Sequence, residues 1–204
     1  MLLKIHPQNP QGRHIANAID VINKGGVIIY PTDTVYGIGC SIYNTEAIER
    51  VYRIKRQDHG KPFSFMCSDL SHISEYARVS NTAFRIMKHL IPGPYTFILP
   101  ASKLKQLPKS MISKRKEVGI RVPDNNICHE LLRGVGHPIL NASVENEHGE
   151  LLNDPETIYH LYENQIDVML DGGYSLLELS TVLDLTNEQP VVVREGAGDL
   201  QTIL

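Results

Sequence analysis

The sequence predicts a single α/β domain whose twisted central sheet mixes parallel and antiparallel strands. Short apolar runs rich in β-branched residues alternate with segments in which apolar residues have helical spacing. Near the C-terminus several strand-like runs follow one another directly, which favours a mixed sheet over a regular parallel one. At 204 residues, with 42% hydrophobic and 21% charged residues, the chain can bury one large core. We expect one domain over residues 1–204 and no additional C-terminal domain.

The expected elements follow from this periodicity and from residues that begin and end helices. A helix over residues 10–24 ends at a glycine pair and leads into a strand over residues 27–30. Thr45 is the expected N-cap of the next helix, which carries Lys55 and Arg56 at its C-terminal end. Further helices are expected over residues 71–76, 80–90, 125–132 and 155–163. Further strands are expected over residues 63–67, 95–99, 118–123, 139–140, 168–170, 182–185 and 191–194.

Residues 31–39 form the most polar connection next to a predicted strand, and we expect a loop there. Thr32, Asp33 and Thr34 supply two hydroxyls and one carboxylate, and two glycines allow close backbone approach to a small ligand. The same residues also suit a turn in which Thr and Asp side chains cap their own backbone. Local chemistry leaves a ligand pocket and a self-capped turn equally open.

Charge is distributed unevenly along a chain whose net charge is only -3. Residues 50–133 contain sixteen Lys and Arg against six Asp and Glu, whereas residues 134–193 contain eleven acids and no Lys or Arg. Six basic residues gather in one segment: Lys103, Lys105, Lys109, Lys114, Arg115 and Lys116. This segment could attract RNA by counterion release, or it could be a solvated loop whose lysines serve solubility.

Cysteine and histidine spacing argues against a metal centre or a disulfide framework. Cys40, Cys67 and Cys128 are far apart and odd in number, so we expect small buried apolar side chains. None of the nine histidines has the spacing of a zinc motif. Apolar runs are too short for a membrane span and the first residues do not resemble a signal peptide, so we expect a cytoplasmic protein that does not engage membranes.

Two arginines stand beside or within apolar strand-like runs, where a buried guanidinium needs an anionic partner. Arg121 lies between Ile120 and Val122, and Arg194 ends the last predicted strand. The partner could be a carboxylate or phosphate of a ligand, or equally a protein acid such as Asp33. The sequence contains no phosphate-binding P-loop, so any nucleotide would be held by scattered basic and hydroxyl groups.

Several of these segments together resemble the YrdC-like family, which makes threonylcarbamoyl-AMP for tRNA modification. The matching segments are residues 31–37 (Pro-Thr-Asp-Thr-Val-Tyr-Gly), the Lys55 region, 92–96 (Pro-Gly-Pro-Tyr-Thr), 119–123 (Gly-Ile-Arg-Val-Pro), 180–184 (Ser-Thr-Val-Leu-Asp) and 194–196 (Arg-Glu-Gly). They run in the family's order, so the resemblance covers nearly the whole chain, with the domain core over about residues 12–198. The implied fold has helices around a twisted mixed sheet and a concave basic cavity.

The resemblance also implies a reaction and a set of site residues. Family members join ATP, L-threonine and bicarbonate with release of pyrophosphate, using Mg2+ and no tightly bound metal. The threonine side would be formed by Thr32, Thr34, Arg121 and Ser180. The nucleotide side would be formed by Lys55, Arg56, Thr96, Ser143 and Arg194, with Lys55 and Ser143 as the catalytic residues. The implied partners are tRNA or double-stranded RNA, and other proteins of tRNA modification.

Two positions depart from the synthase pattern, and both lie on the nucleotide side. The family's K-x-R motif is Lys55-Arg56-Gln57 here, and its S-x-N motif is Ser143-Val144-Glu145. An anion at position 145 would cost about 1–3 kcal/mol of nucleotide binding, unless a one-residue shift of the loop brought Asn146 into place. Glu145 could also help to hold Mg2+.

These departures resemble the YciO branch of the family, which is linked with double-stranded RNA binding. Two main hypotheses follow, which can both hold. The first is a weak threonylcarbamoyladenylate synthase, a nucleotidyltransferase that uses ATP. The second is an RNA-binding module without synthase activity. A third hypothesis is a hydrolase of a related adenylate, with Glu145 as its candidate base.

Overall fold

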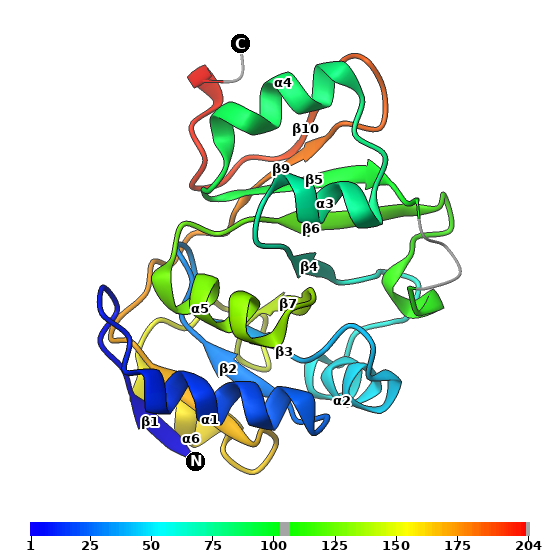
Figure 1. Ribbon diagram of the computed structural model, residues 1–204. Coiled ribbons are helices and arrows are strands. Elements are labelled where there is room, and N and C mark those ends of the chain that lie inside the picture. Colours follow the sequence, from blue (N-terminus) through cyan, green and yellow to red (C-terminus); the bar gives the residue numbers. More distant parts are fainter. Residues whose placement is uncertain (103–106, 203–204) are drawn as a thin grey trace.

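The computed structural model describes residues 1–102 and 107–202 and shows one long mixed sheet flanked by helices (Figure 1). The strands are β1 (Leu2–Lys4), β2 (Ile28–Tyr30), β3 (Gly37–Gly39), β4 (Ser64–Met66), β5 (Tyr95–Pro100), β6 (Glu117–Arg121), β7 (Ile139–Ser143), β8 (Val168–Asp171), β9 (Thr181–Asp184) and β10 (Val191–Arg194). The helices are α1 (Gly12–Asn23), α2 (Thr45–Lys55), α3 (Leu70–Tyr76), α4 (Asn81–Leu90), α5 (Asn126–Val135) and α6 (Pro155–Tyr162), with short 3-10 turns η1 (Lys109–Met111) and η2 (Leu200–Thr202).

Across the described residues, the strands follow the order β1-β8-β2-β3-β7-β4-β6-β5-β9-β10. The pairs β1–β8, β8–β2, β4–β6 and β5–β9 are parallel, and the remaining neighbours are antiparallel. This confirms the predicted single α/β domain with a mixed sheet. Because β3 and β7 sit in the middle of the order, the loops that follow β2 and β7 meet near the centre of the sheet.

Two apolar clusters cover the two faces of the sheet. On one face α1 and α5 pack against each other (Figure 1). Their Ile22 and Leu131 side chains are fully buried in the apolar cluster on this face. The larger cluster on the other face includes Ile48 of α2, Ile73 of α3 and Phe65 of β4. No helix in the described part of the chain has the length and apolarity that a membrane crossing requires.

The three cysteines are buried free thiols, as expected from their spacing. Burial raises the pKa of the Cys40 thiol to about 12 and also raises the pKa values of Cys67 and Cys128. Among residues 1–102 and 107–202, no cluster of three or more His, Cys, Asp or Glu side chains is arranged to hold a metal ion.

The structure corrects three local expectations. The end of the expected loop is a strand, β3, which forms a hairpin with β2 and also pairs with β7. Its glycines let the chain approach its own neighbours, because a Cβ on Gly39 would lie 2.0 Å from the carbonyl oxygen of Leu140. Asn44, and not Thr45, caps α2, with its side chain accepting a hydrogen bond from the Ala47 amide at 2.9 Å. The short edge strand β1 was also not among the expected elements.

Candidate functional site

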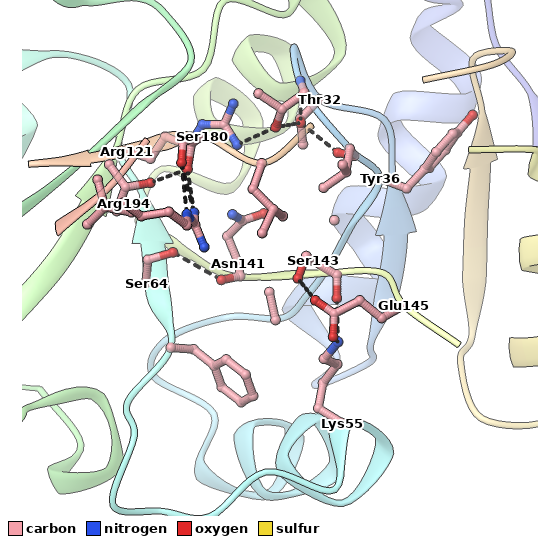
Figure 2. Close-up of a pocket in the computed structure, with 18 of the residues that line it drawn as sticks. Thr32, Tyr36, Lys55, Ser64, Arg121, Asn141, Ser143, Glu145, Ser180 and Arg194 are labelled. Atoms are coloured by element: carbon pink, nitrogen blue, oxygen red, sulfur yellow. Dashed lines mark hydrogen bonds and ion pairs between the residues drawn. The ribbon is translucent and has the colours of Figure 1, made fainter. Parts of the chain in front are cut away.

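A polar cavity of about 250 Å³ opens between the two halves of the sheet, and most of the predicted site residues line it (Figure 2). Strands β3 and β7 with the end of α2 form one wall, and β5, β6, β9 and β10 form the other. The predicted residues that line this cavity are Thr32, Thr34, Lys55, Thr96, Arg121, Ser143, Ser180 and Arg194. The fold therefore brings together side chains that lie up to 162 positions apart, from Thr32 to Arg194.

The loop after β2 is both a self-capped turn and part of the cavity lining. The Thr32 hydroxyl donates to the Val35 carbonyl at 2.7 Å and accepts from the Thr34 amide at 3.0 Å, which fixes the turn. Thr34 directs its own hydroxyl toward β6, where it accepts a hydrogen bond from Arg121 at 2.9 Å. The same residues thus form the self-capped turn and line the cavity.

Arg121 ends β6 with its side chain buried at the cavity. One terminal nitrogen donates to Asp33 Oδ1 at 2.5 Å, and the two side chains are only 3% and 10% exposed. Asp33 is held in place because its Oδ2 accepts from the Asp124 amide at 3.1 Å. The Nε of Arg121 is buried and has no hydrogen-bond partner among the described residues.

A second polar group lies beside Arg121, on β5, β9 and β10. The hydroxyls of Thr96 and Ser180 are 2.8 Å apart. Arg194 donates to the Ser180 carbonyl from Nε at 3.1 Å and from a terminal nitrogen at 2.9 Å. Partial burial, followed by the nearby charge of Arg121, lowers the pKa of Arg194. Two guanidinium groups therefore share this wall of the cavity, as Figure 2 shows.

The opposite wall holds Lys55, Ser143 and Glu145 (Figure 2). Lys55 Nζ donates to the Ser143 carbonyl at 2.7 Å and to Glu145 Oε2 at 3.0 Å, with the lysine side chain only 7% exposed. The Ser143 hydroxyl donates to the other carboxylate oxygen of Glu145. The Glu145 backbone carbonyl accepts from the Tyr162 hydroxyl at 2.5 Å, which ties this loop to α6. The Glu145 carboxylate thus lines the cavity and is held from both oxygens.

Of the residues next to Lys55 and Glu145, Gln57 lines the cavity whereas Arg56 and Asn146 do not. Helix α2 ends at Lys55, and Arg56 adopts a left-handed conformation with φ of 48°, so it lies outside the cavity lining and borders a neighbouring surface groove. Gln57 lines the cavity and donates to the Lys61 carbonyl at 2.6 Å. Asn146 instead bonds to Glu150 at 2.6 Å, so the loop does not present its amide to the cavity.

Three further polar residues line the cavity and were not predicted as site residues: Tyr36, Ser64 and Asn141. Ser64 on β4 donates to the carbonyl of Asn141, its register partner on β7, at 3.1 Å. Tyr36 donates to the Gly173 carbonyl at 2.7 Å, and burial raises its pKa. A signal for Ser64 exists in the sequence, because it interrupts two phenylalanines in a strand-like run where alternation places it on the other face.

The basic segment forms a separate surface beyond the cavity. Lys109, Lys114, Arg115 and Lys116 are exposed, while Lys103 and Lys105 lie outside the described residues. Three of these lysines and His59 border a groove of about 410 Å³. The loop between α2 and β4 separates this groove from the cavity, because Gln57 and Phe63 line the cavity whereas His59 lines the groove.

The lining groups suit binding and charge stabilisation better than covalent catalysis. Among the described residues, the cavity wall carries hydroxyls, amides, three cations and one carboxylate, and it contains no His or Cys side chain. Such a wall can hold carboxylates and phosphates in a fixed arrangement and can stabilise negative charge that develops in a transition state.

Comparison with known proteins agrees with the fold. Residues 20–196 match the Sua5/YciO/YrdC family model, which is described as "Telomere recombination". The Escherichia coli K12 protein YciO is 46% identical over 202 residues, covering 98% of this chain and 97% of YciO, and is described as uncharacterized. The crystal structure of E. coli YciO superposes with a TM-score of 0.94, covering 100% of this chain and 99% of YciO.

More distant relatives have a named activity. The threonylcarbamoyl-AMP synthase of Bacillus subtilis is 30% identical over 184 residues, covering 89% of this chain and 53% of the synthase. The crystal structure of Pyrococcus abyssi Sua5 complexed with L-threonine has a TM-score of 0.92 at 24% identity, covering 100% of this chain and 59% of that one, and it shows the shared fold. With a family model matched over most of its length and close relatives over nearly all of it, this chain belongs to the Sua5/YciO/YrdC family.

Proposed function

We propose that the cavity binds L-threonine and an adenine nucleotide, and that the protein is a weak threonylcarbamoyladenylate synthase acting in tRNA modification. The observation that carries this proposal is the buried wall formed by Arg121, Thr34 and Ser180, because it offers a guanidinium donor and hydroxyls to a small polar ligand. The names of the synthases at about 30% identity support the reaction class.

Arg121 is the group that would receive the threonine carboxylate. Asp33 and Thr34 already hold two of its nitrogens, so the guanidinium is fixed before any ligand arrives. Preorganised donors gain affinity because little conformational freedom is lost on binding. Arg121 lines the cavity, so a ligand carboxylate there would meet a guanidinium that is already oriented.

The nucleotide would lie against Thr96 and Arg194 and extend toward Lys55 and Ser143. In the proposed reaction the threonine amine and bicarbonate condense to a carbamate with loss of water. A carbamate oxygen then attacks the α-phosphorus of ATP, and the bond from this phosphorus to the oxygen that bridges to the β-phosphorus breaks, so that pyrophosphate leaves. This route needs no covalent enzyme intermediate, in agreement with a wall of hydroxyls and cations. Lys55 and Ser143 would act on the phosphates, and both are currently engaged by Glu145.

Mg2+ fits this cavity only as a companion of the nucleotide. Mg2+ is usually held by one or two carboxylates together with substrate phosphates. Glu145 is the one carboxylate among the described lining residues, and its two oxygens are occupied by Lys55 and Ser143. Mg2+ would therefore arrive on the phosphates, where it would neutralise their charge, with Glu145 as its protein ligand only after the contact to Lys55 opens.

Pyrophosphate release tests the synthase proposal. The wild type, at millimolar ATP and bicarbonate, is expected to release pyrophosphate faster when L-threonine is added. Arg121→Lys keeps the positive charge and loses the fork geometry, so it is expected to raise the threonine concentration needed for half-maximal release. Arg13→Lys, on the exposed side of α1, is the matched control. Release that does not depend on threonine would contradict the proposal.

RNA binding is a second candidate function, favoured by the exposed basic groove. His59 and three lysines line this groove, and a single loop separates it from the cavity. We propose that the groove holds the phosphate backbone of structured RNA while the cavity faces one of its bases or ends.

The salt dependence of RNA affinity tests this second proposal. Changing Lys114, Arg115 and Lys116 together to Ala is expected to weaken binding and to reduce the slope of log affinity against log salt by up to about three. A matched control changes Lys24, which is exposed at the C-terminal end of α1, to Ala. Unchanged affinity and slope in the triple variant would contradict an RNA site in this groove.

A further inference from the structure

The cavity contains fewer available positive charges than its residue types suggest. Its described lining includes three cations, Lys55, Arg121 and Arg194. Each of them could in principle meet one phosphate group. Which of them can do so depends on the protein carboxylates that already neutralise them.

Two of the three cations are matched by protein acids. Arg121 forms a buried ion pair with Asp33 at 2.5 Å. Lys55 forms a largely buried ion pair with Glu145 at 3.0 Å and also donates to the Ser143 carbonyl at 2.7 Å. Since a buried pair resists separation, neither cation offers a full positive charge to a ligand.

Arg194 is the cation that remains. It donates to the carbonyl and, at 3.3 Å, to the hydroxyl of Ser180, which are neutral acceptors, and no carboxylate of residues 1–102 or 107–202 forms an ion pair with it. The hydroxyls of Ser180 and Thr96 lie beside it. One guanidinium and two hydroxyls therefore face the cavity as an anion subsite of single charge (Figure 2).

We infer that the nucleotide for which this cavity is built carries a single phosphate, as a nucleoside monophosphate or an acyl adenylate does, and not a triphosphate. This inference rests on the proposed function, in that it assumes a nucleotide in the cavity. A chain of three phosphates would bring additional negative charge into a cavity whose opposite wall ends in the Glu145 carboxylate.

The same charge balance gives a reason for weak synthase activity. All three phosphates of ATP can be bound by cations only when the ion pair between Lys55 and Glu145 opens. A single phosphate at Arg194 leaves this ion pair intact. The protein would then hold the adenylate that the family produces more firmly than the triphosphate from which it is made.

Calorimetric titration with AMP and with ATP, each with and without MgCl2, tests the inference. In the wild type AMP is expected to bind at least as tightly as ATP. Glu145→Gln keeps the side-chain shape and frees Lys55, so ATP is expected to bind about 10- to 100-fold more tightly while the affinity for AMP changes less than threefold. Gln57→Arg is the second variant, used if Glu145→Gln fails to fold. It adds a cation and leaves the ion pair intact, and it is also expected to tighten ATP binding.

The possible results separate the inference from the proposed function. ATP that binds more tightly than AMP to the wild type overturns the inference and leaves the proposed function standing. A wild type and variants that bind neither nucleotide overturn both. An equal gain for AMP and ATP in Glu145→Gln also overturns the inference, because the glutamate would then not discriminate by phosphate number.

Discussion

Replacing Asp33 with Asn isolates the buried ion pair that holds the arginine of the cavity. The Arg121 and Asp33 side chains are 3% and 10% exposed, and their polar atoms are 2.5 Å apart. Removing one partner of such a pair costs about 3–5 kcal/mol, because a charge is left buried without compensation. Asn retains the shape and one neutral acceptor, so we expect a loss near the lower end, about 3 kcal/mol in the free energy of unfolding.

Urea unfolding followed by circular dichroism measures this loss, since the chain contains no Trp for a fluorescence signal. A loss of about 3 kcal/mol would lower the urea midpoint by about 1 M or more. Asp20→Asn is the matched control, because Asp20 pairs with Lys24 at 2.7 Å on the surface, where such pairs contribute at most about 1 kcal/mol. If Asp33→Asn were no more destabilising than Asp20→Asn, the structural role assigned to the buried pair would be wrong.

Two further predictions concern the sheet and the buried thiols. Gly39→Ala is expected to destabilise the fold by about 3 kcal/mol or more, because the new Cβ would lie 2.0 Å from the backbone oxygen of Leu140. Gly12→Ala in α1 meets no atom within 4 Å and is expected to be neutral or stabilising in the same urea assay, so equal losses would refute the steric reason. Stability is also expected to fall as the pH rises above about 9. The Cys40 thiol has a folded pKa of about 12, so it stays protonated in the folded state while its unfolded form ionises, which costs about 1.4 kcal/mol per pH unit for each such group. Cys40→Ala should reduce that slope between pH 9 and 11, and an unchanged slope would contradict the assignment.

Most of the fold could be predicted from the sequence, because most of its strands coincide with apolar runs rich in β-branched or aromatic residues and most of its helices have a clear buried stripe. The two strands that were missed, β1 and β3, lack such a run. In β1 only Leu2 and Leu3 are apolar and both are partly exposed, so no alternation marks the strand. In β3 a single Ile stands between two glycines, and its strand conformation is set by pairing with β2 and β7.

The candidate site could be predicted as a set of residues but not as a set of contacts. Hydroxyl and basic residues next to buried strands meet at one cavity, since strand ends from distant parts of the chain lie together in this sheet. The sequence left the partner of Arg121 open between a ligand and Asp33, and the structure shows Arg121 bound to Asp33. The contact of Lys55 with Glu145 joins residues 90 positions apart, and no local pattern indicates it.

The central claim is that one wall of the cavity is ready for threonine while the other is neutralised against a triphosphate. Separate calorimetric titrations of L-threonine and ATP, into the wild type and into the double variant Glu145→Asn with Gln57→Arg, test it most directly. We predict the same threonine affinity in both proteins and ATP affinity that rises about tenfold or more in the variant. Unchanged ATP affinity, or an equal shift for both ligands, would contradict the claim.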